Sequence, residues 1–231
     1  MHLLVDSTGL KLCDAGEWLH EKHGTKLRRS WRKLHLGMDA GTGQIVASVL
    51  TTKDVDDGSQ VGPLLDQVED PLASFTGDGA YDQHGVAASI GARHPEAAII
   101  VPPCANAVPS ETAETAPTQR DRHLQHITGH GRMAWQIASG YTKRARAETG
   151  MARFKQVIGD GLRSHTDERR ATEVSVAVHV LNRMLLVWTA PGGIGCARMR
   201  SVLISDKGDR PWTRLAELEW IRRSMFFSCT G

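Results

Sequence analysis

The segment YTKRARAETGMARFK, residues 141–155, decides how we expect this chain to fold. Read as a helix at ~100° per residue, it has a polar edge that spans about 60° and consists of Tyr141, Arg144, Glu148 and Lys155. An apolar stripe lies roughly 80° away and consists of Ala147, Met151, Phe154 and Ile158. The pattern therefore predicts a helix that packs on a core and presents a glutamate beside that core. Such a glutamate is a candidate for chemistry if other carboxylates converge on it.

Composition allows one large domain, or one domain with an appendage, in the 231 residues. Hydrophobic residues make up 40% and charged residues 23%, as in ordinary globular proteins, and the net charge of +2 does not by itself indicate a nucleic-acid binder. Residues 22–33, however, hold six Lys or Arg and no acid. Such runs are usually solvated surfaces, but they can also neutralise phosphates. The candidate DNA contacts in this run are Arg28, Arg29 and Lys33.

The cysteines and the apolar runs limit the class of protein. The four cysteines are far apart and form no CxxC pair, which argues against a structural zinc site. No signal peptide is evident, and no apolar run approaches the ~20 residues that span a bilayer. We therefore expect a reduced, cytoplasmic protein with no membrane role.

Two aspartates follow short apolar runs. Residues 3–5 form such a run that ends in Asp6, and the turn-capable Ser7-Thr8-Gly9 comes next, so we expect a buried strand with a carboxylate at its end. Residues 75–79 predict a second short strand that carries Asp78 between two glycines at its tip. Each aspartate taken alone could equally cap a turn.

Further elements follow from periodicity and turn residues. Residues 31–38 and 44–51 predict two strands joined by a hairpin turn at 39–43, which makes the first three strands antiparallel. In the strand at 31–38 we expect His35 to be structural and not a ligand. The remaining expected elements are helices at 56–68, 81–91 and 173–188, a strand at 97–101 and a mobile loop at 104–118.

Three histidines, His123, His126 and His130, have a spacing that suits metal binding on a helix. No cysteine accompanies them, and Thr128-Gly129 and Gly131 are expected to break a regular helix. We therefore do not predict a metal site there.

The order of elements brings the acids together. In a mixed sheet of this order the first and fourth strands can lie side by side, so Asp6 and Asp78 can meet, and a crossing helix can add Glu148. Three carboxylates so close together repel one another unless cations lie between them. Their hard oxygen atoms suit Mg²⁺ or Mn²⁺. Two such ions can promote phosphoryl transfer, with Arg144 and Lys155 holding phosphates.

These segments resemble DDE transposases, specifically those of the insertion sequence 5 family. The resemblance covers about residues 3–190, and its most specific part is the spacing Tyr141-x2-Arg144-x3-Glu148-x6-Lys155. The other matching segments are VDSTGLK (5–11), WRKLHLGMD (31–39), GDGAYD (77–82) and VLNRM (180–184).

The resemblance implies an α/β, ribonuclease-H-like catalytic domain at residues 1–190. Its mixed five-stranded sheet would have the first three strands antiparallel and helices on its flanks. Asp6, Asp78 and Glu148 would bind two divalent ions, Mg²⁺ or Mn²⁺, for nicking at transposon ends and strand transfer to target DNA. Tyr141, Arg144 and Lys155 would contact DNA or position Glu148. A homo-oligomer assembled on DNA, associated with a bacterial nucleoid, is the implied setting.

Two departures from the family pattern lead us to expect a truncated copy. Almost nothing precedes the first aspartate strand, where family members carry a DNA-recognition region, and residues 191–231 form a tail unlike the family. The alternative functions are therefore a catalytically silent, DNA-binding remnant of a transposase and a stand-alone nuclease of the same fold.

Overall fold

The computed structural model describes residues 1–12 and 30–189. The chain divides into two compact units, residues 1–186 and 187–231, and almost all described residues belong to the first. Arg28, Arg29 and the expected tail at 191–231 lie outside the described residues.

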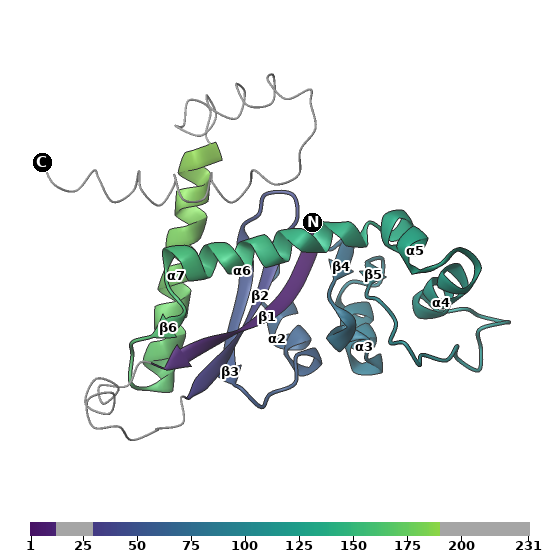
Figure 1. Cartoon of the computed structure of the whole chain (residues 1–231), viewed down its shortest axis with the longest axis horizontal. Helices are drawn as coiled ribbons and strands as arrows, with labels where there is room; N and C mark the ends of the chain where they lie inside the picture. Colours follow the sequence, from purple (N-terminus) through teal and green to yellow (C-terminus); the bar gives the residue numbers. More distant parts are fainter. Residues whose placement is uncertain (13–29, 190–231) are drawn as a thin grey trace, which may run out of the picture. The chain divides into compact units, whose positions relative to one another are not determined.

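A mixed sheet forms the centre of the first unit (Figure 1). Its strand order is β3-β2-β1-β4-β5, with β1, β2 and β3 antiparallel and with β4 and β5 parallel to β1. This confirms the α/β, ribonuclease-H-like sheet, including the adjacent first and fourth strands. A sixth strand, β6, was not predicted and pairs with the end of β1. The bounds are β1 His2–Leu12, β2 Trp31–Asp39, β3 Ile45–Thr52, β4 Ser74–Thr76, β5 Ala98–Ile100 and β6 Gly161–Leu162.

Strand β1 is much longer than the sequence indicated. Ser7-Thr8-Gly9, expected to form a turn, continue the antiparallel ladder with β2, which runs from Leu3 opposite Asp39 to Lys11 opposite Trp31. The partner strand supplies hydrogen bonds along the whole segment, and these outweigh the local turn preference. Asp6 is therefore in the middle of a strand and not at its end.

The helices surround this sheet, and several differ from expectation. The expected helix at 56–68 is reduced to a single turn, η1, and the short α2. By contrast, α4 continues regularly through Thr128-Gly129 and ends before Gly131, and a capping box between Thr118 and Asp121 stabilises its start. The bounds are η1 Gly58–Gln60, α2 Val61–Leu65, η2 Gly79–Tyr81, α3 His84–Arg93, α4 Gln119–His130, α5 Arg132–Ser139, η3 Tyr141–Arg144, α6 Ala145–Val157 and α7 Asp167–Thr189.

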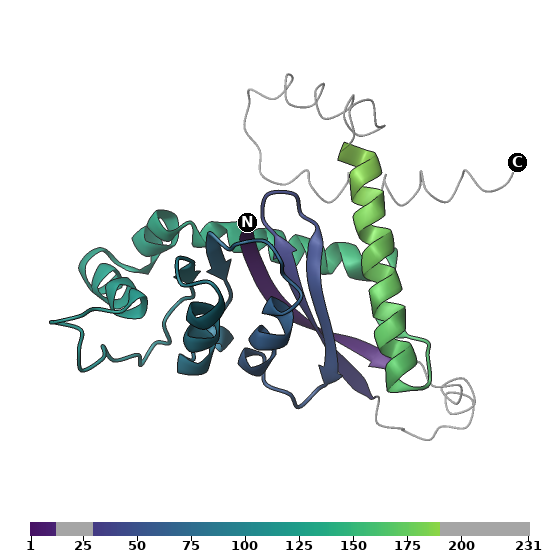
Figure 2. The same ribbon diagram turned by 180° about the vertical axis from the view of Figure 1, so that it is seen from behind.

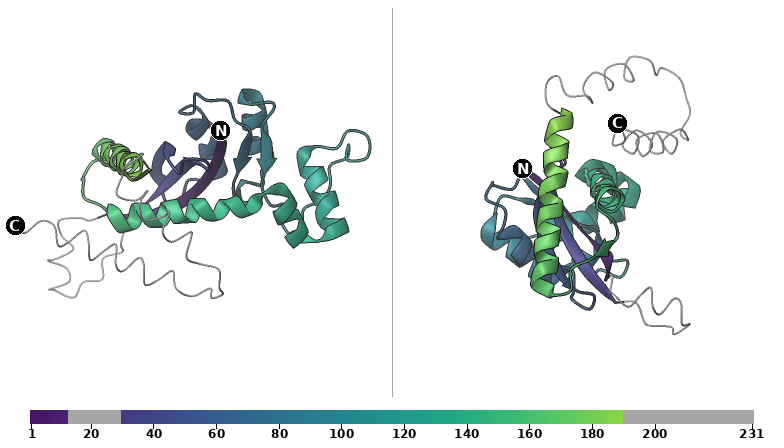
Figure 3. Two further views of the ribbon diagram at one scale, coloured as in Figure 1. Left: turned by 90° about the horizontal axis from the view of Figure 1, so that it is seen from above. Right: turned by 90° about the vertical axis from the view of Figure 1, so that its left-hand side faces the viewer.

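Each face of the sheet has its own core. One core contains residues of α6 and α7 packed against β1 and β2, and the other contains residues of α2 and α3. Figure 2 shows α2 and α3 in front of the strands and α6 behind them, and Figure 3 shows the same arrangement from above. Ala147, Met151 and Phe154 of the predicted apolar stripe are buried, whereas Ile158 caps the end of α6 and is 37% exposed.

Gly150 is a point of close contact between α6 and the sheet. A Cβ atom at this position would overlap the terminal atoms of the buried Met38 on β2. Glycine therefore lets the backbone of α6 approach the strand directly.

Candidate functional site

The central strand β1 positions Asp6. Successive side chains of a strand point to opposite faces, so Asp6 shares a face with Leu4 and Leu10, which belong to the core beneath α6. The backbone N–H of Ser7 donates a hydrogen bond of 2.9 Å to Asp6 Oδ1. Burial raises the pKa of Asp6, although Arg144 and the Ser7 N–H act in the opposite direction. Even with Arg144 beside it, this carboxylate is thus less readily ionised than a carboxylate in water.

Asp78 follows the neighbouring strand β4. Leu4 pairs with Thr76, so continuing the parallel register places Asp78 level with Asp6. Asp78 also caps η2, where the Ala80 N–H donates a 2.9 Å hydrogen bond to its Oδ1. Gly77 is required here, because a Cβ atom would lie 2.7 Å from the ring of Tyr81. The Gly-Asp-Gly segment is thus held in a defined position and is more than a loose turn.

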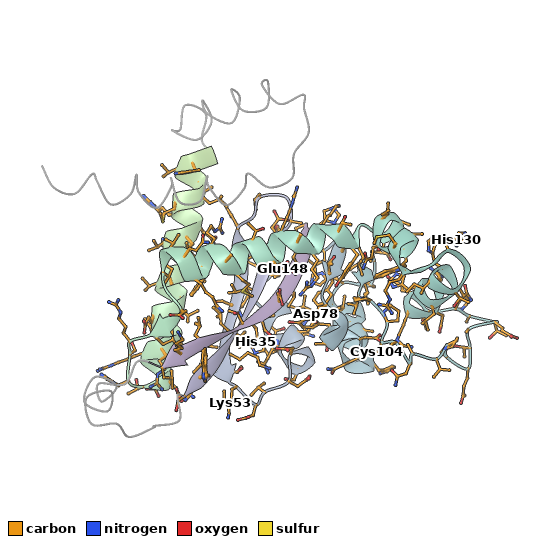
Figure 4. The ribbon with its side chains drawn as sticks, in the orientation of Figure 1. His35, Lys53, Asp78, Cys104, His130 and Glu148 are labelled. Carbon is orange, nitrogen blue, oxygen red and sulfur yellow. The ribbon has the colours of Figure 1, made fainter. Side chains whose placement is uncertain are left out.

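Arg144 joins the three predicted carboxylates. Its guanidinium lies 2.7 Å from Glu148 Oε1, 3.3 Å from Asp6 Oδ2 and 3.6 Å from Asp78 Oδ2. Figure 4 shows Glu148 on α6 and Asp78 beyond the end of β4. The structure therefore gathers Asp6, Asp78 and Glu148 around a single cation; their catalytic roles stay predictions.

The donor chemistry fits a divalent ion, with Arg144 at present between the carboxylates. Three carboxylates and one guanidinium leave a formal charge of −2, and the donors are hard oxygen atoms. Within residues 1–12 and 30–189, no three Cys, His, Asp or Glu side chains are already arranged to hold a metal ion, and this includes the three histidines of α4. Binding of ions by the carboxylates would thus require Arg144 to move aside.

Tyr141 and Lys155 are placed differently with respect to the carboxylates. Tyr141 packs its ring 5.4 Å from that of buried Trp135, and burial raises the pKa of its phenol. Lys155 is seven residues, or roughly 10 Å, along the helix axis from Glu148. The charge of Lys155 acts on Asp160 instead. The structure therefore brings Arg144, but not Lys155, into contact with the acids.

Lys33 has partners within the molecule. Its ammonium donates a 2.8 Å hydrogen bond to the carbonyl of Val55 and lies 3.4 Å from Asp57. The same Asp57 carboxylate lies 3.3 Å from Nδ1 of buried His35, whose Nε2 lies 2.9 Å from the Thr51 hydroxyl. His35 is thus structural, as expected. Lys33 helps to hold the segment after β3, and its contact with DNA stays a prediction.

Sequence reasoning missed two features of the site. The central position of Arg144 was signalled only by its i,i+4 spacing from Glu148, and we expected this arginine to hold phosphate or to position Glu148. The second is Asp82, at the end of the GDGAYD segment, which pairs at 2.7 Å with Arg120 of α4. This ion pair ties the Asp78 segment to α4, and nothing in the local sequence of Asp82 indicated it.

Comparisons with known proteins found a family match and a structural similarity. A family model described as the transposase DDE domain matches residues 1–183. Among solved structures, the chain is similar to a piggyBac transposase in a synaptic complex with hairpin DNA, with a TM-score of 0.47 and 12% sequence identity. The similarity covers 80% of this chain and 46% of that protein, so this chain spans about half of its length. In the described part of the chain, no helix is both long and apolar enough to span a membrane.

Proposed function

This chain belongs to the transposase DDE domain family, and from that premise we propose that it carries out metal-dependent cleavage and transfer of DNA strands of an insertion sequence of the type-5 group. The observation that carries the proposal is the convergence of Asp6, Asp78 and Glu148 from three separate elements on one cation. Carboxylates from β1, the end of β4 and α6 have no need to meet for the stability of the fold.

In this proposal Asp6, Asp78 and Glu148 hold two divalent ions, Mg²⁺ or Mn²⁺. When bound, such ions activate an attacking hydroxyl and stabilise the leaving oxygen of a phosphodiester. Glu148 is the most exposed of the three proposed ligands, since its side chain is 63% exposed in the first turn of α6. Without the ions, Arg144 compensates one of the three negative charges, and once released it can donate two hydrogen bonds to a phosphate.

The proposed partners are transposon ends and target DNA, with a homo-oligomer assembled on the DNA in a bacterial nucleoid. Tyr141 and Lys155 are proposed to contact the DNA strand on either side of Glu148, along with the basic run that contains Arg28 and Arg29. A silent DNA-binding remnant and a stand-alone nuclease remain the competing functions, and they differ from the proposal in what they do to DNA.

The test uses the purified chain and DNA that carries the element's own ends, with Mg²⁺ or Mn²⁺. We expect nicking and joining by the natural protein, and loss of both to below detection in Asp78→Asn, because the substitution removes a charged ligand. Asp70→Asn is the matched control, since Asp70 is exposed and precedes β4, whereas Asp78 follows that strand. Cleavage that survives Asp78→Asn would contradict the proposal. DNA binding without nicking would support the remnant, and nicking without joining the nuclease.

A further inference from the structure

A pocket of about 320 Å³ lies between α6 and the turn that joins β2 to β3. The turn contributes residues 40–43, and α6 contributes Arg146, Thr149 and Arg153. Arg146 and Arg153 are seven residues apart and so lie within about 20° on the helix, whereas both are roughly 140–160° from Glu148. The pocket is therefore on the opposite side of α6 from the carboxylates.

Both arginines are anchored by the turn without being neutralised. Arg146 donates a hydrogen bond to the carbonyl of Ala40, and Arg153 donates one of 3.1 Å to the carbonyl of Gly43. A guanidinium has five N–H donors, so most of them remain for another acceptor. In the described part of the chain, neither arginine forms an ion pair, while five others do.

The surroundings leave a positive charge uncompensated. Arg153 is half-buried, its Nε is buried without a hydrogen-bond partner, and burial lowers the pKa of its guanidinium. Asp39 begins the same turn and its hydrogen bonds with Gly41 and Thr42 favour its charged form, but within the described residues its carboxylate forms no ion pair with either arginine. A partly desolvated cation of this kind gains from an anion supplied by a ligand.

We propose that this pocket binds a phosphate group of the DNA backbone. Guanidinium groups match phosphate oxygens in geometry and stay charged, and two of them facing one cavity give a site for a single diester. The choice of DNA as the source rests on the proposed function. In this assignment one side of α6 contributes to the reaction site, and the other side binds a phosphate of the DNA backbone.

The test measures the salt dependence of binding to a short duplex by fluorescence anisotropy. We expect the double variant Arg146→Gln/Arg153→Gln to bind about 3- to 10-fold more weakly at moderate salt. The slope of log K against log salt should fall by about 0.9, because one phosphate is no longer neutralised. Arg169→Gln is the matched control, because Arg169 is an exposed arginine of α7 that makes no ion pair within the described residues. A double variant with the slope of the control would overturn the proposal.

Charge-preserving variants separate binding from folding. Arg146→Lys and Arg153→Lys should keep most of the salt slope, whereas a purely structural anchor would be lost in the Lys and Gln variants alike. Thermal unfolding of each variant shows whether it is folded. A Lys variant that is folded but has lost the slope would also contradict the proposal.

Two further experiments identify the source of the phosphate and test the pocket separately from the proposed catalytic function. If inorganic phosphate, at matched ionic strength, stabilises the natural protein but not the double variant while DNA binding is equal in both, the site takes a free anion and the DNA assignment is wrong. Asp78→Asn should lose cleavage yet keep the natural salt slope. Failure of catalysis and failure of this pocket are therefore read from different measurements.

Discussion

The two sides of α6 treat the same type of residue in opposite ways. Arg144, immediately before the helix, contacts three carboxylates, whereas Arg146 and Arg153 contact only backbone carbonyls. Two residues of separation turn a side chain by about 200° around a helix, which is enough to move it from one environment to the other. The comparison teaches that the role of an arginine is set by what the neighbouring strands place opposite it.

The largest expected effect is on the acidic side of α6, where Arg144 contacts Asp6, Asp78 and Glu148. Arg144→Gln removes the cation that a divalent ion must displace, so we expect the affinity for Mn²⁺ without DNA to rise by on the order of a hundredfold, since a unit charge a few ångströms away is worth several kcal/mol at most. Isothermal titration calorimetry measures this directly. Arg146→Gln is the control and should leave the affinity unchanged. Equal affinity in Arg144→Gln and the natural protein would show that Arg144 does not compete with metal.

The next effect concerns the packing of α6 against strand β2 at Gly150. Gly150→Ala places a methyl group against the terminal atoms of Met38, which can shift because this side chain is flexible and lines the neighbouring pocket, so we expect a loss of only about 1 kcal/mol in the free energy of unfolding. Urea denaturation measures it. Gly91→Ala in α3 is the control, because nothing lies within 4 Å of its new Cβ, and there the substitution should stabilise by up to about 1 kcal/mol. If both variants behave alike, the close approach of α6 to β2 is not needed.

Much of the acidic side could be predicted from sequence, because it depends on strand order and on residues within one helix. The parallel pairing of β1 and β4 follows from the order of elements, and it sets Asp78 level with Asp6. The contact of Arg144 with all three acids could not be predicted, since a helical wheel gives the direction of a side chain but not its reach across to two strands.

The basic side of α6, which carries Arg146 and Arg153, could not be predicted at all. Its pocket needs the turn at residues 39–44 to lie against α6, a contact between segments more than a hundred residues apart. Predictions of secondary structure from local sequence also failed where contacts with distant segments determine the structure. The β2 ladder kept Ser7-Thr8-Gly9 in a strand, and β6 has only two residues, too few for any periodicity.

The smallest effect is the pH dependence of stability, which sets the pH range in which the two sides of α6 can be compared. Burial lowers the pKa of His35 below its ordinary value of 6.5, although Asp57 acts to raise it, and burial lowers the pKa of His123 as well. The unfolded chain then binds protons that the folded chain does not, so stability is full above pH 6.5 and falls as the pH drops below it. We expect a loss of at most about 1.4 kcal/mol per pH unit for each histidine, measured by urea denaturation between pH 8 and 5.5. His35→Gln should flatten this dependence. If the natural protein keeps constant stability over that range, acid-induced changes in DNA or metal binding must be assigned to the sides of α6 themselves and not to the fold.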